Sequence, residues 1–458
     1  MKIFPVQNFS YNINNTSKTE TSKKNKTFYK TAAMAGVSSG ILIGGLLIHK
    51  NIKIRKIKEV LCSKFPNDVK YRKELLNSIG ISQDNWFSIR SIIGGQEYKS
   101  IISDFSNSPV SYTSGKSLLT KKQDDYELIG VNNRTFRLSM HNHTINSDGK
   151  MSVSELLDQA ARYADLVAKS NKNKSAVLAK EAPFTIAISD HDTIEGCKEA
   201  VKIIAANPKK YKNLRVVLGA ELSVENRMLG DDLIKPIQNH LVINCINPFD
   251  KELNTYLNKF KIVRKKAASD FLEKYKDELK KTSAKDIVSN LSIEEASKYS
   301  SSVKYGVNYP WYYLKGYIKS KLSQNNEKIA LDTFNSVQSK FEPKLDLQDY
   351  CMDMAEAMNI ISKQEYGYMT LAHIALTPVG NCVKTGIDAH KSLDKLISIF
   401  KSTGGAKSLC AEVYYPYYGD VAASKEWLNT IKTAVNNNKL LPTGGLDSHG
   451  KSIFYSNL

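Results

Sequence analysis

The sequence has 458 residues, of which 41% are hydrophobic and 24% are charged. This composition excludes a wholly disordered chain and a protein that crosses a membrane many times, and the length predicts two or three structural units of about 150 residues. The formal net charge of +19 favours anionic partners such as phosphorylated metabolites, nucleic acids or acidic membrane surfaces, although a solvated lysine-rich surface explains any single lysine equally well.

The N-terminal part is the most basic, with 11 Lys or Arg against two Glu in the first sixty residues. Residues 1–30 are polar and show no apolar period, which predicts a disordered basic tail. Residues 31–49 are uncharged and have about the length that spans a bilayer, roughly 20 residues. A single membrane anchor and a buried or surface helix are equally favoured there, and the basic flanks on both sides leave the orientation open. Residues 50–132 are predicted to be a helical and loop-like linker.

Six scattered cysteines give no CxxC pair and no tight spacing. This pattern argues against a disulfide-built secreted domain and against a zinc knuckle, and it predicts reduced core residues. We therefore expect a cytoplasmic protein, with an inner-membrane anchor through residues 31–49 as an open alternative.

From residue 133 onward, short apolar runs alternate with helical patterns. The runs are TFRLSM (135–140), FTIAIS (184–189), RVVLGA (215–220), HLVINC (240–245), YMTLAH (368–373), LCAEVYY (409–415) and LLPTGG (440–445). Runs this short and this rich in β-forming residues predict buried parallel strands. Several helices between them have recognisable ends: Ser152 and Glu155 form a capping box, and Gly404 and Gly405 stop a helix. The alternation predicts an α/β barrel or an open parallel sheet.

Residues 251–364 interrupt this alternation with a segment that is rich in Lys and Tyr and mostly helical in pattern. We interpret it as an inserted helical subdomain. A lid whose basic face binds phosphates and a solvated helical decoration are equally consistent with its composition.

Most histidines and many carboxylates stand beside the predicted strands. Six of the eight histidines do so, namely His141, His143, His191, His240, His373 and His449, and only His240 opens its run instead of closing it. The neighbouring carboxylates are Asp148, Asp190, Asp192, Glu221, Glu412 and Asp447. Because the carboxyl ends of parallel strands meet at one mouth, these side chains are predicted to converge there. His49 and His390 are assigned no role.

Imidazole nitrogens and carboxylate oxygens without thiolates suit Zn, Mn or Fe. Two such ions can bind phosphate oxygens and lower the pKa of a bound water to about 7. Each motif alone has an ordinary alternative: HxH can be a surface pair, SDHDT can begin a helix, and Glu221 or Asp447 can be a loop carboxylate. Their combination predicts a metal-dependent phosphoesterase.

The combined motifs resemble the PHP (polymerase and histidinol phosphatase) family of metal-dependent phosphoesterases. The matching stretches are HNHTINSDGKMSVSELLDQAARYA, AISDHDTIEGCKEA, VVLGAELS, HLVI, TLAH, AEVYY and GLDSHG. They lie within residues 133–250 and 365–455, about half of the chain, which we take as the phosphoesterase domain. The layout is most similar to bacterial phosphoesterases and 5′-to-3′ nucleases with a helical insertion, which here would be residues 251–364.

The resemblance implies a distorted parallel (β/α)7-type barrel that holds two or three divalent ions, Mn, Zn or Fe. Carried over by position, His141, His143, Glu221 and Asp447 would hold one ion, with Glu221 bridging to a second held by His240 and His373, and Asp148, His191 and His449 would hold a third. The chain departs from the family pattern at Ser139, Ile374 and Leu446. These residues neighbour the ligands, so the departures affect how the ligands are oriented and which metal is preferred.

The predicted reaction is hydrolysis of a phosphomonoester, or of a nucleotide or oligonucleotide end, by a metal-activated water, with Asp190 handling the proton. One alternative is a small-metabolite phosphatase of the histidinol-phosphate type. Another is an inactive metal-binding module that serves as a membrane-tethered scaffold. The predicted partners are a phosphorylated small molecule or nucleic-acid end and, through residues 31–49, a membrane; no protein partner is predicted.

Overall fold

The structure is a computed structural model, and only part of the chain is placed well enough to describe. The described residues are 119–122, 125–128, 138–172, 184–226, 237–323, 326–345, 351–364, 367–374, 389–403, 409–414, 425–444 and 447–450. The predicted tail (1–30), the predicted anchor (31–49) and most of the predicted linker (50–132) lie outside these residues. Near the linker's end, β1 (Leu119–Lys122) and β2 (Asp125–Leu128) form an antiparallel pair. Within the described ranges, no helix has both the length and the apolar character to span a membrane.

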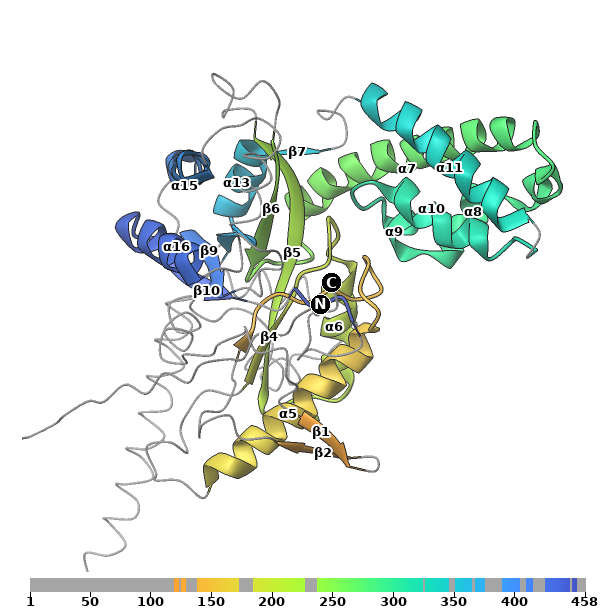
Figure 1. The fold of residues 1–458 in the computed structure, drawn as a ribbon. Helices are drawn as coiled ribbons and strands as arrows, with labels where there is room; N and C mark the ends of the chain where they lie inside the picture. Colours follow the sequence, from red (N-terminus) through yellow and green to blue (C-terminus); the bar gives the residue numbers. More distant parts are fainter. Residues whose placement is uncertain are drawn as a thin grey trace, which may run out of the picture. The chain divides into compact units, whose positions relative to one another are not determined.

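One sheet carries the fold, with the strand order β10-β9-β8-β6-β5-β4-β3 (Figure 1). Its strands are β3 (Leu138–Ser139), β4 (Phe184–Ile188), β5 (Leu214–Asn226), β6 (Ile237–Asn244), β8 (Tyr368–Leu371), β9 (Leu409–Tyr414) and β10 (Leu441–Gly444). The short β7 (Met352–Asp353) pairs with β5 off this path. Each of the seven apolar runs overlaps one strand along the path, which confirms that each run contains a strand.

Four helices connect parallel neighbours in this sheet. They are α5 (Val153–Lys172), α6 (Glu195–Ala206), α15 (Ala389–Thr403) and α16 (Lys425–Asn437). The predicted capping box precedes α5, since the amide of Glu155 donates to the Ser152 hydroxyl and the Glu155 carboxylate accepts from Ser152. The fold is therefore mixed α/β. Wherever consecutive strands are parallel, a helix long enough for a crossover connects them.

The prediction of an all-parallel sheet is wrong for β6. This strand is antiparallel to both β5 and β8. Only residues 227–236 separate β5 from β6, whereas a parallel crossover needs about a dozen residues or more. The two strands therefore pair as a hairpin, with Asn226 opposite Ile237.

The sheet is curled into a half-barrel whose edges approach each other. The chain that follows β3 meets the chain that follows β10 in a parallel bridge between Asn142 and Ser448. The amide of His143 donates to the carbonyl of Ser448 (3.0 Å), and the amide of Ser448 donates to the carbonyl of His141 (3.3 Å). This bridge brings the first and last predicted motifs together.

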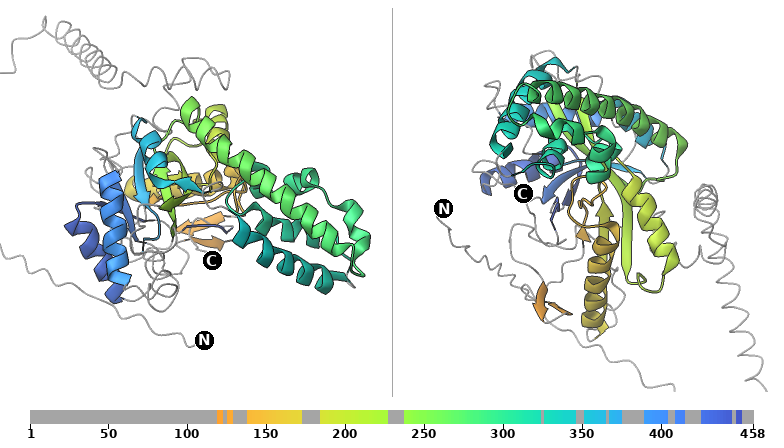
Figure 2. Two further views of the ribbon diagram at one scale, coloured as in Figure 1. Left: turned by 90° about the horizontal axis from the view of Figure 1, so that it is seen from above. Right: turned by 90° about the vertical axis from the view of Figure 1, so that its right-hand side faces the viewer.

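Residues 251–364, interpreted from the sequence as an insertion, are mostly helical in the structure. Their helices include α7 (Lys251–Leu279), η3 (Lys285–Asn290), α8 (Ile293–Tyr299), α9 (Ser301–Tyr305), α10 (Pro310–Lys319), α11 (Glu327–Phe341) and η5 (Glu342–Lys344). The helices α9, α10 and α11 pack along α7 (Figure 2) around a core that includes Phe271, Trp311 and Phe334. Helix α13 (Met354–Ser362) also lies within residues 251–364, but it belongs to the core of the sheet and not to this helical core.

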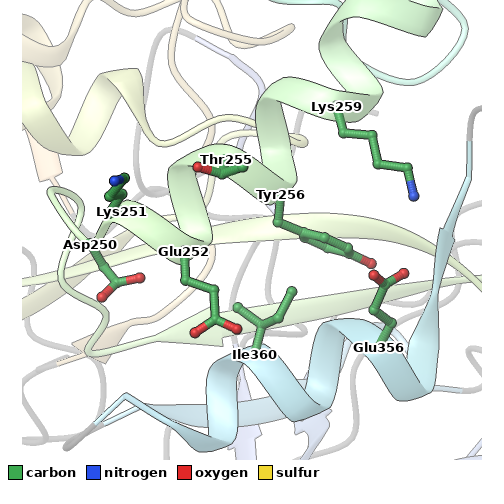
Figure 3. A pocket seen from close by; sticks show the side chains of 8 residues that line it. All are labelled: Asp250, Lys251, Glu252, Thr255, Tyr256, Lys259, Glu356 and Ile360. Atoms are coloured by element: carbon green, nitrogen blue, oxygen red, sulfur yellow. The ribbon is translucent and has the colours of Figure 1, made fainter.

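The first turns of α7 are anchored to the sheet as well. Leu253 and Phe260 are buried in the same core as α13. Between α7 and α13 lies an open cavity of about 650 Å³, lined by charged side chains together with Tyr256 and Ile360 (Figure 3). None of the histidines lines this cavity, so it is separate from the cluster described next.

Candidate metal centre

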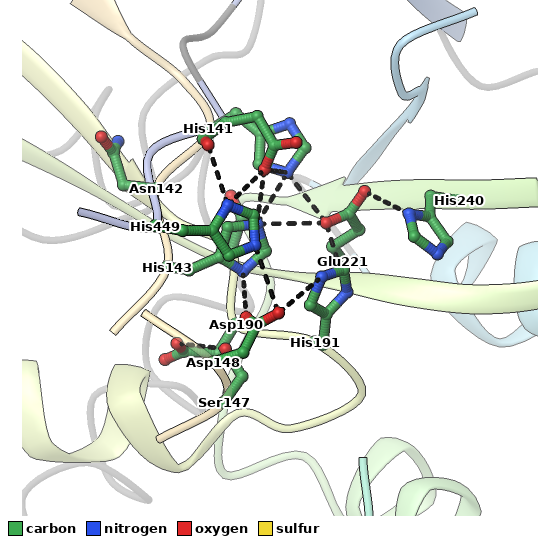
Figure 4. A network of polar contacts seen from close by, with 12 residues as sticks. His141, Asn142, His143, Ser147, Asp148, Asp190, His191, Glu221, His240 and His449 are labelled. Carbon is green, nitrogen blue, oxygen red and sulfur yellow. Dashed lines mark hydrogen bonds and ion pairs between the residues drawn. The ribbon is translucent and has the colours of Figure 1, made fainter. Parts of the chain in front are cut away.

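The structure brings the nine predicted metal-ligating side chains into one cluster. His141, His143 and Asp148 follow β3, His191 follows β4, Glu221 lies in β5, His240 in β6, His373 follows β8, and Asp447 and His449 follow β10. Figure 4 shows imidazoles and carboxylates from these separate segments pointing toward one another. His240 lies at the start of its apolar run, whereas the other histidines of the cluster close or follow theirs. The antiparallel direction of β6 explains this, because the first residues of β6 lie beside the last residues of β5 and β8. His240 pairs there with Ser223 of β5.

Four of the side chains present a tetrahedral group of ligand atoms, all within 4.8 Å of one another. His141 Nε2 lies 3.1 Å from His143 Nε2, 2.9 Å from Glu221 Oε2 and 3.4 Å from Asp447 Oδ1. His143 Nε2 lies 3.2 Å from Glu221 Oε2 and 2.9 Å from Asp447 Oδ1. These five separations are those expected between ligands of one ion, because atoms about 2 Å from a tetrahedral zinc ion lie about 3.3 Å apart.

Hydrogen bonds alone cannot satisfy this group. A ring nitrogen carries at most one proton, yet Nε2 of His141 and Nε2 of His143 each face two carboxylate oxygens as well as each other. All four side chains are buried. A single cation would satisfy all four ligand atoms at once, so the residues fit a divalent metal.

The second oxygen of Glu221 faces a different pair of imidazoles. Glu221 Oε1 lies 2.9 Å from His240 Nδ1 and 3.0 Å from His373 Nε2, and these two nitrogens are 3.2 Å apart. Glu221 thus presents one oxygen to each of two groups of nitrogens. This is the arrangement expected of a carboxylate that bridges two cations.

Asp148 lies at the middle of a third group. Its Oδ2 is 3.3 Å from His449 Nε2 and 3.7 Å from His191 Nε2. Its Oδ1 is 3.7 Å from His143 Nδ1, too long for a hydrogen bond, and both of these buried atoms lack a hydrogen-bond partner among the described residues. Since a buried carboxylate oxygen without a partner is costly, this group also fits a cation.

The charges of the cluster point to a bound cation as well. Burial lowers the pKa of His141, but Glu221, Asp447 and Glu412 together raise it well above its usual value. Burial lowers the pKa of His143 too, and its contacts with Asp447 and Glu221 raise it to about 10. In the ion-free protein the carboxylates therefore favour the protonated forms of His141 and His143. A bound metal would supply the positive charge that these protons carry.

Metal binding should consequently release protons and strengthen with pH. An imidazole must lose its proton before it can bind a metal, and His143, with a pKa of about 10, is protonated at neutral pH in the ion-free protein. Affinity is expected to rise as the pH is raised from 7 toward 10. Burial lowers the pKa of His191 to about 4, so this residue should release no proton in that range. Calorimetric titration with Mn²⁺ in two buffers of different ionisation enthalpy measures the protons released, and a value of zero at pH 7 would contradict the expectation.

Glu412 supports two of the ligands, a role that the sequence did not reveal. Its Oε1 lies 3.1 Å from Nδ1 of His141, and its Oε2 accepts a hydrogen bond from the backbone amide of His373 (2.7 Å). Carboxylates of this kind fix the orientation of metal-binding imidazoles. The sequence placed Glu412 near the histidines, but spacing alone does not separate a ligand from its supporting partner.

Asp190 supports the loop after His143. It is fully buried and accepts hydrogen bonds from the backbone amide of Thr144 (2.6 Å) and from the Ser147 hydroxyl (3.0 Å). Burial raises the pKa of Asp190, and the hydrogen bonds from Thr144 and Ser147 lower it in part. Its role in proton handling stays a prediction, whereas these contacts favour a positioning role.

Three residues of the cluster region have strained backbones. His373, Asp447 and Asp192 adopt φ angles of 30°, 48° and 54°, a region that costs residues other than glycine about 1–3 kcal/mol. Such strain tends to concentrate at functional sites. His390, by contrast, lies exposed on α15, and His49 lies outside the described residues.

Comparison with known proteins gives only distant similarity. No protein-family model and no curated protein matches the chain. A structure from Bifidobacterium adolescentis, provisionally assigned as a metal-dependent phosphoesterase, is 16% identical, with 69% of this chain and 88% of that chain covered and a TM-score of 0.42. An amidohydrolase from Chromobacterium violaceum, with bound sulfate and no metal, is 18% identical, with 69% and 88% covered and a TM-score of 0.39. The function therefore has to be inferred from the side chains of the centre.

Proposed function

We propose that the chain is a metal-dependent phosphoesterase that uses a metal-activated water. The observation that carries the proposal is the position of Glu221, whose two oxygens face two separate groups of imidazole nitrogens. Bound divalent cations would supply a water with a pKa near about 7 and would neutralise the charge of the phosphate group. Phosphate esters are among the slowest substrates to hydrolyse without a catalyst, so both contributions are needed.

The residues of the chain would prepare this chemistry by holding the ligands in place. Glu221 would join two cations. Glu412 contacts the ring of His141 and the backbone amide of His373, and so holds both residues in position next to Glu221. Asp190 fixes the loop that carries Asp148. The nine predicted ligands all lie in the cluster, which supports an active centre over an inactive scaffold.

A group of lysines supports an anionic substrate with more than one phosphate, such as a nucleotide or oligonucleotide end. Burial lowers the pKa of Lys261, and the nearby Lys265, Lys198 and Lys304 lower it further while Glu195 opposes them. Lys261 and Lys304 lie 5.2 and 5.0 Å from the ring centre of Tyr305. Lys261 and Tyr305 line the same small cavity as Asp192, the neighbour of His191. The cavity measures about 20 Å³, room for a single water, so the lysines would attract an anionic substrate from outside it.

A substrate panel tests the proposal. The purified protein is loaded with Mn²⁺ and offered 5′-nucleotides, 3′,5′-bisphosphates, short RNA and histidinol phosphate, and phosphate or nucleotide release is measured. We expect turnover of nucleotide substrates that disappears after chelation and returns with Mn²⁺. Turnover of histidinol phosphate alone would favour the small-metabolite phosphatase, and metal binding without any turnover would favour the scaffold.

A further inference from the structure

The helical insertion reaches the metal centre at two neighbouring residues. The hydroxyl of Tyr313, on α10, donates to Asp148 Oδ2 at 3.1 Å. The hydroxyl of Ser302, on α9, donates to the backbone carbonyl of Ser147. The insertion therefore contacts both the carboxylate of Asp148 and the peptide that carries it. Nothing in the family resemblance assigns a role to either contact.

A buried ion pair holds the insertion against the same region. Arg264, on α7, places Nη1 2.9 Å from Asp192 Oδ2, and both side chains are completely buried. Asp192 Oδ2 also accepts from the backbone amide of Asn308 (3.0 Å), while its Oδ1 accepts from the amide of Ser223 on β5 (2.8 Å). Asp192 directly follows His191, so one carboxylate joins a candidate ligand segment, the sheet and two parts of the insertion. Separating Arg264 from Asp192 would leave an uncompensated buried charge.

The segment between α9 and α10 has little freedom to move away from α7. Gly306 adopts a left-handed conformation (φ 61°), and a Cβ there would lie 2.7 Å from the carbonyl oxygen of Lys261. Arg264 Nη1 also donates to the carbonyl of Gly306 at 3.4 Å. The position of Tyr313 is therefore fixed through α7, which is itself fixed through Asp192.

Asp148 is the most exposed of the three carboxylates among the predicted ligands, with its side chain 18% exposed against 8% for Asp447 and 0% for Glu221. Glu221 lies within β5, where its backbone pairs with His191 after β4 and with Val242 of β6, and its side chain is fully buried. The Asp148 side chain, in contrast, lies in a loop. A carboxylate at the edge of a loop can turn toward water unless a donor holds it. Tyr313 donates to Oδ2, which His449 Nε2 also approaches at 3.3 Å, and Oδ1 is directed toward His143 Nδ1.

We propose that Tyr313 is a positioning residue of the metal centre. Its hydroxyl fixes Asp148 for the cation that Asp148, His191 and His449 would hold, and the Arg264–Asp192 ion pair fixes the segment that carries Tyr313. The inference rests on the proposed function only in that the centre must bind cations. It follows that the insertion completes one group of ligands and leaves the tetrahedral group around Glu221 Oε2 unaffected.

Stepwise metal titration of the full chain tests this proposal. Ion-free parent protein, Tyr313→Phe and the matched control Tyr312→Phe, which alters an exposed neighbour on α10 (51% exposed), are titrated with Co²⁺, and each binding step is followed by its visible absorption. Tyr313→Phe should weaken one binding step about 10- to 100-fold, the usual effect of losing a group that orients a ligand. The other steps, and every step of Tyr312→Phe, should match the parent.

The outcomes separate this inference from the function on which it rests. Parent-like titration of Tyr313→Phe, or equal weakening of every step, would overturn the role of Tyr313. A parent protein that took up no cation would overturn the proposed function as well. Arg264→Lys, at a residue that touches none of the candidate ligands, tests whether the Arg264–Asp192 ion pair positions Tyr313. It should weaken the same single binding step, while circular dichroism shows that the protein remains folded. Normal affinity at that step would show that the ion pair does not position Tyr313.

Discussion

Replacing His141 with alanine is expected to lower turnover by at least about 10³-fold, because the loss of a cation removes both charge stabilisation and the activated water. His141 occupies one corner of the tetrahedral group and faces Glu221 Oε2 and Asp447 Oδ1. The variant should also lose bound metal from that group. Product release from a substrate that the panel shows to be turned over, and metal content by mass spectrometry, measure both effects.

Two further variants show whether the loss is specific. His390→Ala removes an exposed imidazole on α15 and should leave turnover and metal content unchanged. Glu412→Gln keeps all nine ligands but weakens the support of His141 Nδ1, so a loss of about 10- to 100-fold is expected. If His141→Ala were as active as His390→Ala, the assignment of the centre would be wrong.

The second large effect is expected at Gly196, near the start of α6. A Cβ at this position would overlap Asp190 Oδ2, and Asp190 cannot retreat because Thr144 and Ser147 hold its carboxylate. Gly196→Ala should therefore destabilise the protein by about 1–3 kcal/mol, the usual cost of overpacking, and should lower activity through the loop of Asp148. Urea denaturation and turnover assays provide the measurements.

Gly316 offers a matched control within α10. A Cβ there would meet only the ring of Tyr299, at 3.5 Å, which is ordinary packing distance. Since alanine is favoured over glycine in helices by about 1 kcal/mol, Gly316→Ala should be neutral or stabilising. The two substitutions are chemically identical, but only Gly196→Ala should lower stability. A gain of stability for Gly196→Ala would show that Asp190 is free to move.

The sequence predicts the strands and the convergence of the nine candidate side chains well, because both depend on local pattern. Buried strands require apolar runs, and histidines at their ends are visible as HNH, SDH and DSH. The direction of β6 was missed, although residues 227–236 are too few for a crossover, because the alternation elsewhere favoured parallel pairing. That error also made His240 look exceptional when its position follows from the reversed strand.

The contacts of the insertion could not be predicted in the same way. Helical periodicity indicates which face of a helix is buried, but not what lies opposite it. Arg264 stands among lysines and resembles a surface charge, yet its side chain is completely buried against Asp192. Tyr313 is one of 24 tyrosines, and only the folded chain places its hydroxyl beside Asp148.

The reversed direction of β6 also sets a length requirement on α7. From His240 to Asn244, β6 runs four residues away from the metal centre, about 13 Å of strand. The insertion therefore begins at a distance from the centre. From Leu253 in the core of the sheet to Arg264 beside Asp192, α7 extends over eleven residues, about 16 Å of helix. One residue more or fewer in this stretch would turn Arg264 by about 100° around the helix axis. The length of α7 from Leu253 to Arg264 is therefore constrained. Relatives of this chain should tolerate insertions and deletions beyond Leu279 more readily than within this stretch.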